Sequence, residues 1–332
     1  MLMAAYGADV IKIESPRQGD VGRTWGPPFQ GGESSYFLSL HSDKHSLAVD
    51  MKNPEGVAIC RRLAAQADIL IENFRPGTMN RLGLDYQQLA GINSRLIYVS
   101  ISGYGQTGPR RNEPSMDLVM QAASGLMSFT GTFAGETVRS GHSVADVTAG
   151  TFALVGAMLA LEARHRTGAG QFVDVSMLDT LMSTMAPSFA YYLGCGAIPI
   201  PRGTSFATIV PYRNFSCADR EISIAVASDK LWSSFCHAIG RPDLDEDPRY
   251  RSNPLRVQHR GVLEPLLEEI FRRGTAAHWT EVLLRHGIPC SLVRNLQEVV
   301  EDEQIQARDM LPVLTHPEAG PIQVTGAPVT LS

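Results

Sequence analysis

A single aspartate stands at the start of a long apolar segment. The stretch GHSVADVTAG (141–150) contains Asp146, and no charged residue follows it before Glu162. An aspartate in front of an apolar helix is most often its N-cap, although Thr148 could supply that cap equally well. A helix N-terminus also favours the ionised carboxylate, and a carboxylate is a competent nucleophile where water is excluded. The position of Asp146 therefore leaves two roles open, helix capping and nucleophilic catalysis.

Two neighbouring signatures of other chemistries fail in their context. GHSVA (141–145) comes close to the GxSxG elbow of serine hydrolases. However, Ala145 replaces the glycine that the strained turn requires, and no Asp and His partners for Ser143 can be assigned in order. The glycines within 168–170 follow a helical pattern and precede a strand pattern, the reverse of the order in a dinucleotide-binding loop. We expect neither a serine nucleophile nor a dinucleotide site here.

Metal-ligating residue types are scattered along the chain. His41 and His45 flank a predicted loop. Four other histidines lie in separate helical patterns or at their ends: His237, His259, His278 and His286. There is no HExxH motif or Cys/His cluster. The five cysteines form no CxxC pair, and their odd number fits a reducing compartment: Cys60, Cys195, Cys217, Cys236 and Cys290. We predict no metal site and a cytoplasmic location, or the mitochondrial matrix in a eukaryote.

Composition excludes some classes of partner. The chain has 332 residues, a net charge of −5 and 44% hydrophobic residues, which gives no reason to expect nucleic acid or a membrane as a partner. The longest uncharged stretch, 147–161, is too short to cross a bilayer and predicts a buried core helix.

The elements that must position these residues alternate between strand and helix. Apolar runs predict strands at Val10–Glu14, 68–74, 96–102 and 172–178, and helical patterns follow Asn53, Asp85 and Asp146. Such alternation predicts an α/β fold with a doubly wound, mostly parallel sheet. The chain opens in the middle of a helical pattern and ends abruptly, so we expect it to be truncated at both ends.

The second half of the sequence has a different texture. A hairpin pattern at 212–228 leads into several charged helical patterns. We predict a large Rossmann-like domain over 1–195, completed by about 306–332, then a Gly/Pro-rich linker over 196–211 and a small α+β domain over 212–305.

Several segments together resemble the family III CoA-transferases, the CaiB/BaiF group, over essentially the whole chain. The segments are GADVIKIESP, DMKNPEG, ILIENFRPGTMNRLGLDY, VSISGYGQTGP, AASGLMSFTG, VADVTAG, RTGAGQFVDVSMLD and GIPCSLVRNLQEV. The group includes formyl-CoA transferase, succinyl-CoA:glutarate CoA-transferase and related acyl-CoA racemases, and the texture here is most similar to the dicarboxyl-CoA transferases.

The resemblance implies roles for particular residues. The family's catalytic aspartate falls on Asp146. Its coenzyme A pocket falls on Val49, Asp50, Met51, Lys52, Asn73, Phe74, Arg75, Arg81 and Met116. CoA carries phosphates and an adenine, which call for cations, backbone donors and an apolar face. For the acyl group we assign the glycine-rich loop at Gly103, Tyr104 and Gly105, whose backbone amides could stabilise an oxyanion, together with Gly203.

Three departures from the family pattern refine this assignment. Ser15 stands where many relatives have an arginine, and Arg17 is the available substitute. Met116 stands where the racemases carry a histidine, and methionine can be neither acid nor base, which favours a transferase. The glycine loop of formyl-CoA transferase has no match beyond Gly203, which argues against that substrate.

The resemblance therefore implies an enzyme that moves CoA from an acyl-CoA, such as succinyl-CoA or another small dicarboxyl-CoA, to a free carboxylic acid. Asp146 would form an aspartyl anhydride and then an aspartyl-CoA thioester. CoA is a substrate, and no permanent cofactor is expected. The family resemblance also implies an interlaced homodimer. Two alternatives stay open: an acyl-CoA racemase or epimerase of the same family, and a truncated, non-catalytic CoA-binding protein.

Overall fold

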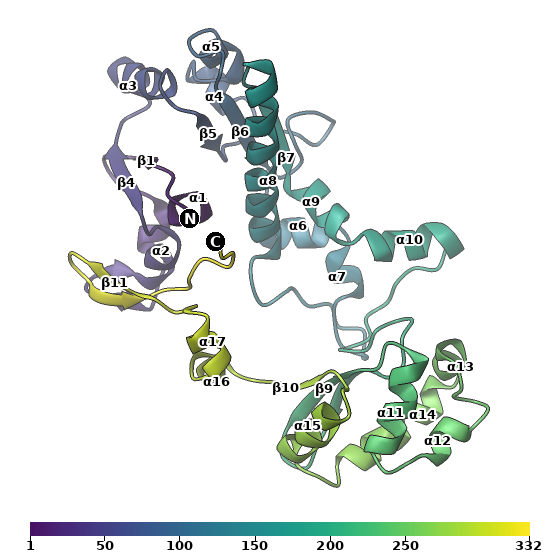
Figure 1. Cartoon of the computed structure of the whole chain (residues 1–332). Coiled ribbons are helices and arrows are strands. Elements are labelled where there is room, and N and C mark those ends of the chain that lie inside the picture. The colour runs from purple at the N-terminus through teal and green to yellow at the C-terminus, as the bar shows by residue number, and fades with distance from the viewer. The chain divides into compact units, whose positions relative to one another are not determined.

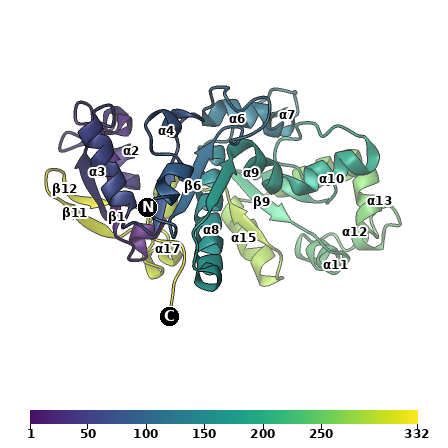
Figure 2. The same cartoon turned by 90° about the horizontal axis from the view of Figure 1, so that it is seen from above.

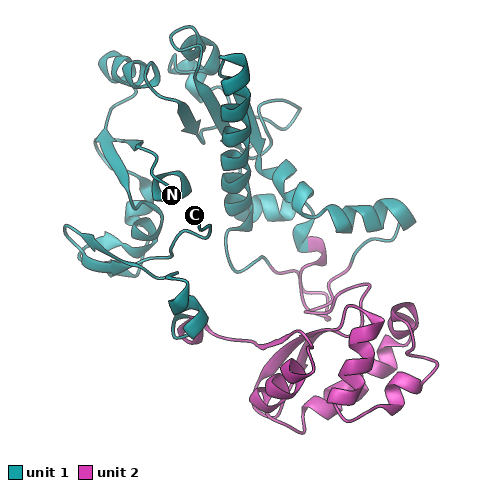
Figure 3. Cartoon of the chain, viewed as in Figure 1, with its two compact units in different colours: residues 1–127, 139–199, 300–332 teal, residues 128–138, 200–299 magenta.

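A computed structural model describes all 332 residues, which divide into two compact units (Figure 3). The first unit contains residues 1–127, 139–199 and 300–332, and the second contains 128–138 and 200–299. The sequence analysis had assigned 128–138 to the large domain. This segment belongs to the second unit, where Gly131 bridges Thr137 and accepts a 2.9 Å hydrogen bond from the backbone N–H of Gly203.

The first unit is α/β with parallel strands, as predicted, but these strands form two separate sheets (Figure 1). One sheet pairs β1 (Val10–Glu14) with β4 (Lys44–Ala48), and the other has the order β5 (Ile69–Glu72), β6 (Ile97–Ser102), β7 (Phe172–Ser176). In the second sheet Glu72 lies opposite Ser100, and Ser102 lies opposite Ser176. The carboxyl ends of β5, β6 and β7 therefore meet at one edge.

Shorter elements complete the first unit. The helices before the long central one are α1 (Leu2–Ala5), η1 (Val21–Thr24), α2 (Ser35–Leu40), α3 (Pro54–Ala64), α4 (Thr78–Arg81), α5 (Tyr86–Ala90) and α6 (Asp117–Ala123). After it come α9 (Met177–Thr184), α10 (Ala186–Cys195) and α17 (Glu303–Ala307), while α7 (Leu126–Phe129) and α16 (Leu296–Val300) cross the boundaries between the units. Two antiparallel hairpins are β2–β3 (Phe29–Gln30, Glu33–Ser34) and β11–β12 (Val313–His316, Gly320–Gln323).

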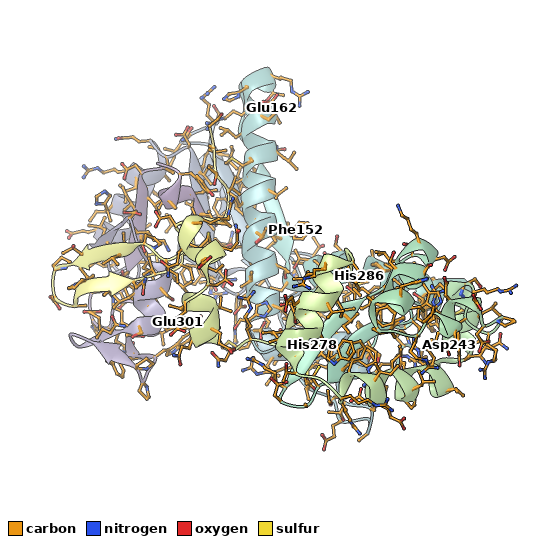
Figure 4. The ribbon with its side chains drawn as sticks, turned by 60° about the horizontal axis from the view of Figure 1, so that its bottom comes forward. Phe152, Glu162, Asp243, His278, His286 and Glu301 are labelled. Carbon is orange, nitrogen blue, oxygen red and sulfur yellow. The ribbon has the colours of Figure 1, made fainter.

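The long helix α8 (Val144–Thr167) packs on β6 and β7 (Figure 2). Its buried side is a stripe of small residues that allows close approach to the sheet: Ala145, Ala149, Ala153, Ala157 and Ala160. The prediction of a buried core helix was wrong for the rest of its surface, because Leu159 is 66% exposed and Phe152, labelled in Figure 4, is also exposed. By length and composition α8 could cross a membrane, a test that core helices of other proteins pass as well.

The second unit has one hydrophobic core between a three-stranded antiparallel sheet and its helices. The sheet order is β10 (Cys290–Leu292), β9 (Glu221–Ala225), β8 (Tyr212–Ser216). The helices are α11 (Asp229–Ala238), α12 (Asp243–Glu246), α13 (Asn253–Gln258), α14 (Arg260–Phe271) and α15 (Ala276–Arg285). Phe215, Trp232 and Phe271 are among the fully buried side chains of this core.

Candidate active site

Asp146 lies in the first turn of α8 and is not its cap. The helix begins three residues earlier than the sequence analysis placed it, with Ser143 at the N-cap position. Residue Asp146 is only partly buried, and its carboxylate makes no hydrogen bond or ion pair. Thr148 is not the cap either, since its hydroxyl donates back to the Val144 carbonyl at 2.7 Å.

The cap of α8 comes from a different helix. Ser143 makes no side-chain capping bond, whereas Oδ1 of Asp117, at the start of α6, accepts from the backbone N–H of Ala145 at 2.9 Å. The other oxygen of Asp117 accepts from Nε2 of Gln121 at 2.7 Å, and Oε1 of Gln121 accepts from the Ser140 N–H at 2.8 Å. The orphan donors at a helix N-terminus need partners of this kind, so the capping role is filled without Asp146.

The surroundings of Asp146 favour a basic carboxylate. Partial burial, and secondly the negative charge of Asp117, raise its pKa above the ordinary value for aspartate. Tyr36, on α2, also lies within electrostatic range, because burial and then the charge of Asp146 raise the pKa of its phenol. The side chain of Asp146 thus reaches solvent and has an acid and a phenol as its titratable neighbours.

The turn assigned to CoA follows β5 directly. Nδ2 of Asn73 donates to the Ile101 carbonyl at 2.8 Å, and the Phe74 N–H donates to Oε2 of Glu72 at 2.8 Å. Burial raises the pKa of Glu72. These two bonds hold the turn in place and leave the ring of Phe74 and the side chain of Arg75 exposed.

Arg81 is exposed on the first unit, as are Asp50 and Lys52 of the segment Val49–Lys52, whereas Val49 is buried. Nη2 of Arg81, the last residue of α4, donates to the Thr78 hydroxyl at 2.9 Å. The backbone N–H of Val49 donates to the Glu14 carbonyl at 2.9 Å, which fixes the segment to the end of β1. Within the segment, the backbone N–H of the exposed Lys52 donates to Oδ1 of Asp50 at 3.0 Å. Met51 packs against the core cluster that contains Tyr98 of β6.

The glycine-rich loop follows β6 and leads toward α6. Gly103 is buried, and a Cβ at this position would overlap the side chain of Ser115, so only glycine allows this approach. The Gly103 carbonyl accepts from the Leu178 N–H at 3.0 Å. Gly105 has a positive φ of 83° and is followed by a residue whose N–H donates to Asp174 at 2.9 Å. Tyr104 accepts a hydrogen bond of 2.7 Å from Arg110.

Most of the predicted residues thus belong to one connected region of the first unit. The connection runs from Asn73 to Ile101, through Gly103 to Ser115, and from Asp117 to α8. Met116 precedes Asp117 and is 66% exposed. Gly203 belongs to the second unit. Arg17 is exposed, and its side chain makes no hydrogen bond or ion pair.

Sequence reasoning missed Asp117, Gln121 and Tyr36. A signal for the first two was present, because an aspartate and a glutamine four residues apart begin the apolar pattern DLVMQAA and lie on one helix face. Tyr36 had no local signal, since only the fold brings α2 near Asp146.

The residues considered for a serine nucleophile and for a metal site do not come together in the structure. His142 interacts with the Ser140 hydroxyl at 3.1 Å and not with Ser143. No group of three or more His, Cys, Asp or Glu side chains could hold a metal ion, and all five cysteines are free. His278 and His286 lie on and just after α15 (Figure 4).

An α/β chain with an unpartnered carboxylate at a helix start has a group capable of covalent carboxylate catalysis. Comparison with known proteins identifies the class. The model of CoA-transferase family III matches residues 1–332, and the chain belongs to this family of enzymes.

Named relatives are similar over the whole chain. Succinyl-CoA:glutarate CoA-transferase of Mus musculus is 38% identical, with 100% of this chain and 76% of that protein covered. Acetyl-CoA:oxalate CoA-transferase of Acetobacter aceti is 37% identical, with 100% and 84% covered. A CaiB/BaiF family protein from Brucella suis has a similar solved structure, with a TM-score of 0.85, 33% identity, and 100% and 87% of the two chains covered.

Proposed function

We propose that this chain transfers CoA from succinyl-CoA, or another small dicarboxyl-CoA, to a free carboxylic acid, with Asp146 as the nucleophile. CoA thioesters and carboxylic acids are the substrate classes of the family to which it belongs. The choice of a dicarboxylate donor rests on the succinyl-CoA:glutarate CoA-transferase that is 38% identical to this chain.

One observation supports Asp146 as the nucleophile above all others. Its carboxylate makes no hydrogen bond at a helix start where Asp117 does the capping through Ala145, at 2.9 Å. A capping carboxylate accepts from backbone N–H groups of the first turn, and Asp146 does not. Asp146 instead faces solvent, with its pKa raised by partial burial and by the charge of Asp117, which makes it a better base and nucleophile.

The proposed reaction proceeds in four balanced steps. A carboxylate oxygen of Asp146 attacks the thioester carbonyl, the C–S bond breaks, and CoA leaves as a thiolate from a mixed anhydride. The thiolate attacks the aspartyl carbonyl, the anhydride C–O bond breaks, and the donor acid leaves as a carboxylate. The acceptor carboxylate then attacks the aspartyl-CoA thioester and expels the thiolate. Attack of that thiolate on the acceptor's carbonyl gives the new acyl-CoA and restores Asp146.

In this proposal exposed residues of the first unit hold CoA. Arg75, Arg81 and Lys52 supply cations for its phosphates, and the Phe74 ring, which is 41% exposed, supplies an apolar face. Asn73 orients the turn through Ile101. Backbone amides of the loop at Gly103–Gly105 are the donors for the oxyanion, and Gly203 stays a prediction for the acyl group.

A racemase is the less favoured reading. Proton exchange at an α-carbon needs an acid and a base on opposite faces. Met116 is the exposed residue in front of Asp117, and a thioether can play neither part.

We further infer that the active protein is a homodimer in the cytoplasm, or in the mitochondrial matrix of a eukaryote. The apolar side chains exposed along α8, among them Val147, Val155 and Leu159, support a partner surface. The five free cysteines support a reducing compartment. Sedimentation velocity of the purified chain tests the dimer, and a single monomeric species at micromolar concentration would contradict it.

Trapping the aspartyl intermediate tests the reaction. The chain is mixed with succinyl-CoA and quenched with hydroxylamine, and the modified residue is located by intact mass and peptide mapping. Asp146→Ala is the loss variant. Asp179→Asn is a matched control, because Asp179 is also an exposed aspartate in the first turn of a helix, α9.

A hydroxamate on Asp146 in the wild type and in Asp179→Asn, absent from Asp146→Ala, is the expected result. No adduct with succinyl-CoA, acetyl-CoA or glutaryl-CoA, while CoA binding persists by titration calorimetry, would contradict the covalent transfer. No adduct and no CoA binding would favour the non-catalytic alternative.

A further inference from the structure

We infer that Asp117 is a positioning residue for the nucleophile: it caps α8 through Ala145 and places a second negative charge beside Asp146. This inference rests on the proposed role of Asp146 as the nucleophile and assigns a specific task to its neighbour on α6.

The hydrogen bonds around Asp117 form a closed arrangement. Both of its carboxylate oxygens are used, one by the Ala145 N–H at 2.9 Å and the other by Nε2 of Gln121 at 2.7 Å. Gln121 is fully buried, and its remaining oxygen accepts from the Ser140 N–H at 2.8 Å. The segment that leads into α8 and the first turn of α8 are therefore both held by two side chains of α6.

This arrangement determines where Asp146 can lie. Ser143 gives the helix no side-chain cap, and Ala145 is fully buried, so water cannot replace Asp117 as the acceptor for its N–H. Asp146 follows Ala145 directly in the chain. A shift of the Ala145 backbone would move the nucleophile, and displacements of about 1 Å at a reacting group cost on the order of 100-fold in rate.

Asp117 is also the anionic group that faces Asp146. From α2, Tyr36 faces it with a phenol, which is neutral at neutral pH. From the preceding turn, His142 interacts with Ser140. Asp179 of α9 and Asp174 of β7 interact with each other.

The charge of Asp117 has a direct chemical effect on its neighbour. Together with partial burial, it raises the pKa of the Asp146 carboxyl. A more basic carboxylate attacks a thioester faster once it is ionised, so the arrangement favours the first step of the reaction.

Two variants separate the charge of Asp117 from its hydrogen bonds. In Asp117→Asn the side-chain oxygen can still accept from Ala145, but the charge is lost and the new amide faces Nε2 of Gln121, donor against donor. The double variant Asp117→Asn/Gln121→Glu removes this conflict. Its glutamate accepts from the asparagine amide and from the Ser140 N–H, so every bond is restored while the charge moves one side chain away from Asp146. Asp179→Asn is the matched control.

The first readout does not depend on activity. The full chain is labelled with ¹³C at aspartate carboxyl groups, the Asp146 signal is assigned by its absence in Asp146→Asn, and its titration is followed by NMR. We expect the titration of Asp146 to move to lower pH in Asp117→Asn by roughly half a unit to one unit. It should move in the same direction in the double variant, and it should not move in Asp179→Asn.

The second readout is the rate of hydroxylamine-trapped adduct formation with succinyl-CoA. We expect about a tenfold fall in Asp117→Asn, and partial recovery in the double variant because the position of α8 is restored. An unchanged Asp146 titration and an unchanged trapping rate in Asp117→Asn would overturn the inference. So would a folded double variant with no recovery of the rate. If the wild type forms no adduct with any donor, the proposed function fails, and the titration alone still decides whether Asp117 acts on Asp146.

Discussion

Helices α8 and α9 begin with the same residue pattern, but different groups cap their first backbone N–H groups. Each has a serine at the N-cap and an aspartate three residues later, Ser143 and Asp146 in α8 and Ser176 and Asp179 in α9. In α9 the Ser176 hydroxyl accepts from the Asp179 N–H at 3.1 Å, so the cap is local. In α8 the serine makes no such bond, and Asp117 of another helix provides the cap.

The difference shows that a capping motif in the sequence does not fix the role of its acid. In α9, where the serine hydroxyl caps its own helix, helix capping explains why the serine is there. In both helices the carboxylate of the aspartate takes no part in the cap, and what distinguishes Asp146 is that Asp117, which caps α8, also raises the pKa of the Asp146 carboxyl. The comparison therefore separates a helix start with a local cap from one with a distant cap within a single chain.

The largest expected difference between the two helix starts is in catalysis. Asp146→Asn should lower the rate of CoA exchange between succinyl-CoA and labelled succinate by at least about a thousandfold, because an amide cannot form the anhydride. Asp179→Asn should change it by less than about threefold. The exchange assay with both purified variants checks this, and equal losses in the two would remove the distinction.

The second difference is in stability and concerns where each cap comes from. Asp117→Ala should lower the free energy of unfolding by about 1–2 kcal/mol, because it removes the cap of α8 and leaves Gln121 without an acceptor. Urea unfolding followed by circular dichroism measures it, with Asp179→Ala as the control. A loss in the control as large as that in Asp117→Ala would contradict a special role for the distant cap.

A smaller difference is expected between the two serines. Ser176→Ala should cost about 1 kcal/mol, since its hydroxyl caps α9, whereas Ser143→Ala should stay within about 0.5 kcal/mol. Both values come from the same urea titrations. A larger loss for Ser143→Ala than for Ser176→Ala would mean that Ser143 caps α8 in solution.

The smallest expected effect is a pH-dependent stabilisation. The folded state raises the pKa of Asp146, so it binds that proton more tightly than the unfolded chain does, and ionised Asp146 opposes folding at neutral pH. Asp146→Asn should therefore slightly raise the thermal midpoint at pH 7, and this gain should disappear below the ordinary aspartate pKa of about 4. Differential scanning fluorimetry from pH 3 to 8 tests the sign, and a lowered midpoint at pH 7 would contradict it.

Local signals in the sequence predicted much of the first unit. The apolar runs gave β1, β5, β6 and β7, and Asn53 caps α3 as expected, with its side chain accepting from the Glu55 N–H at 2.9 Å. The strand β4 was missed because its sequence KHSLA has no apolar alternation, and His41–His45 had been interpreted as a loop. It forms because β1 provides a parallel partner, which no local pattern can reveal.

The candidate site, too, was predicted only in part from local sequence signals. The family resemblance predicted Asp146 and the turn at Asn73 as site residues, because their motifs are continuous in the sequence, and these roles stay predictions. Asp117 and Tyr36 were missed because their importance lies in contacts with α8 that the fold creates. The division of the parallel strands into two sheets also depends on pairing between distant segments.

Side-chain hydrogen bonds also hold the C-terminal end of α8. Arg164 is buried on the same side as the alanine stripe and donates to the Arg95 carbonyl at 3.0 Å and to Asp68 at 2.7 Å, both beside the sheet. The helix is thus fixed at both ends, by Asp117 at its start and by Arg164 near its end. A shift of α8 along its own axis would break the hydrogen bond of Asp117 or those of Arg164. Arg164 lies about 27 Å from Asp146 at roughly 1.5 Å per residue, and a substitution there would allow the start of α8, with Asp146, to move.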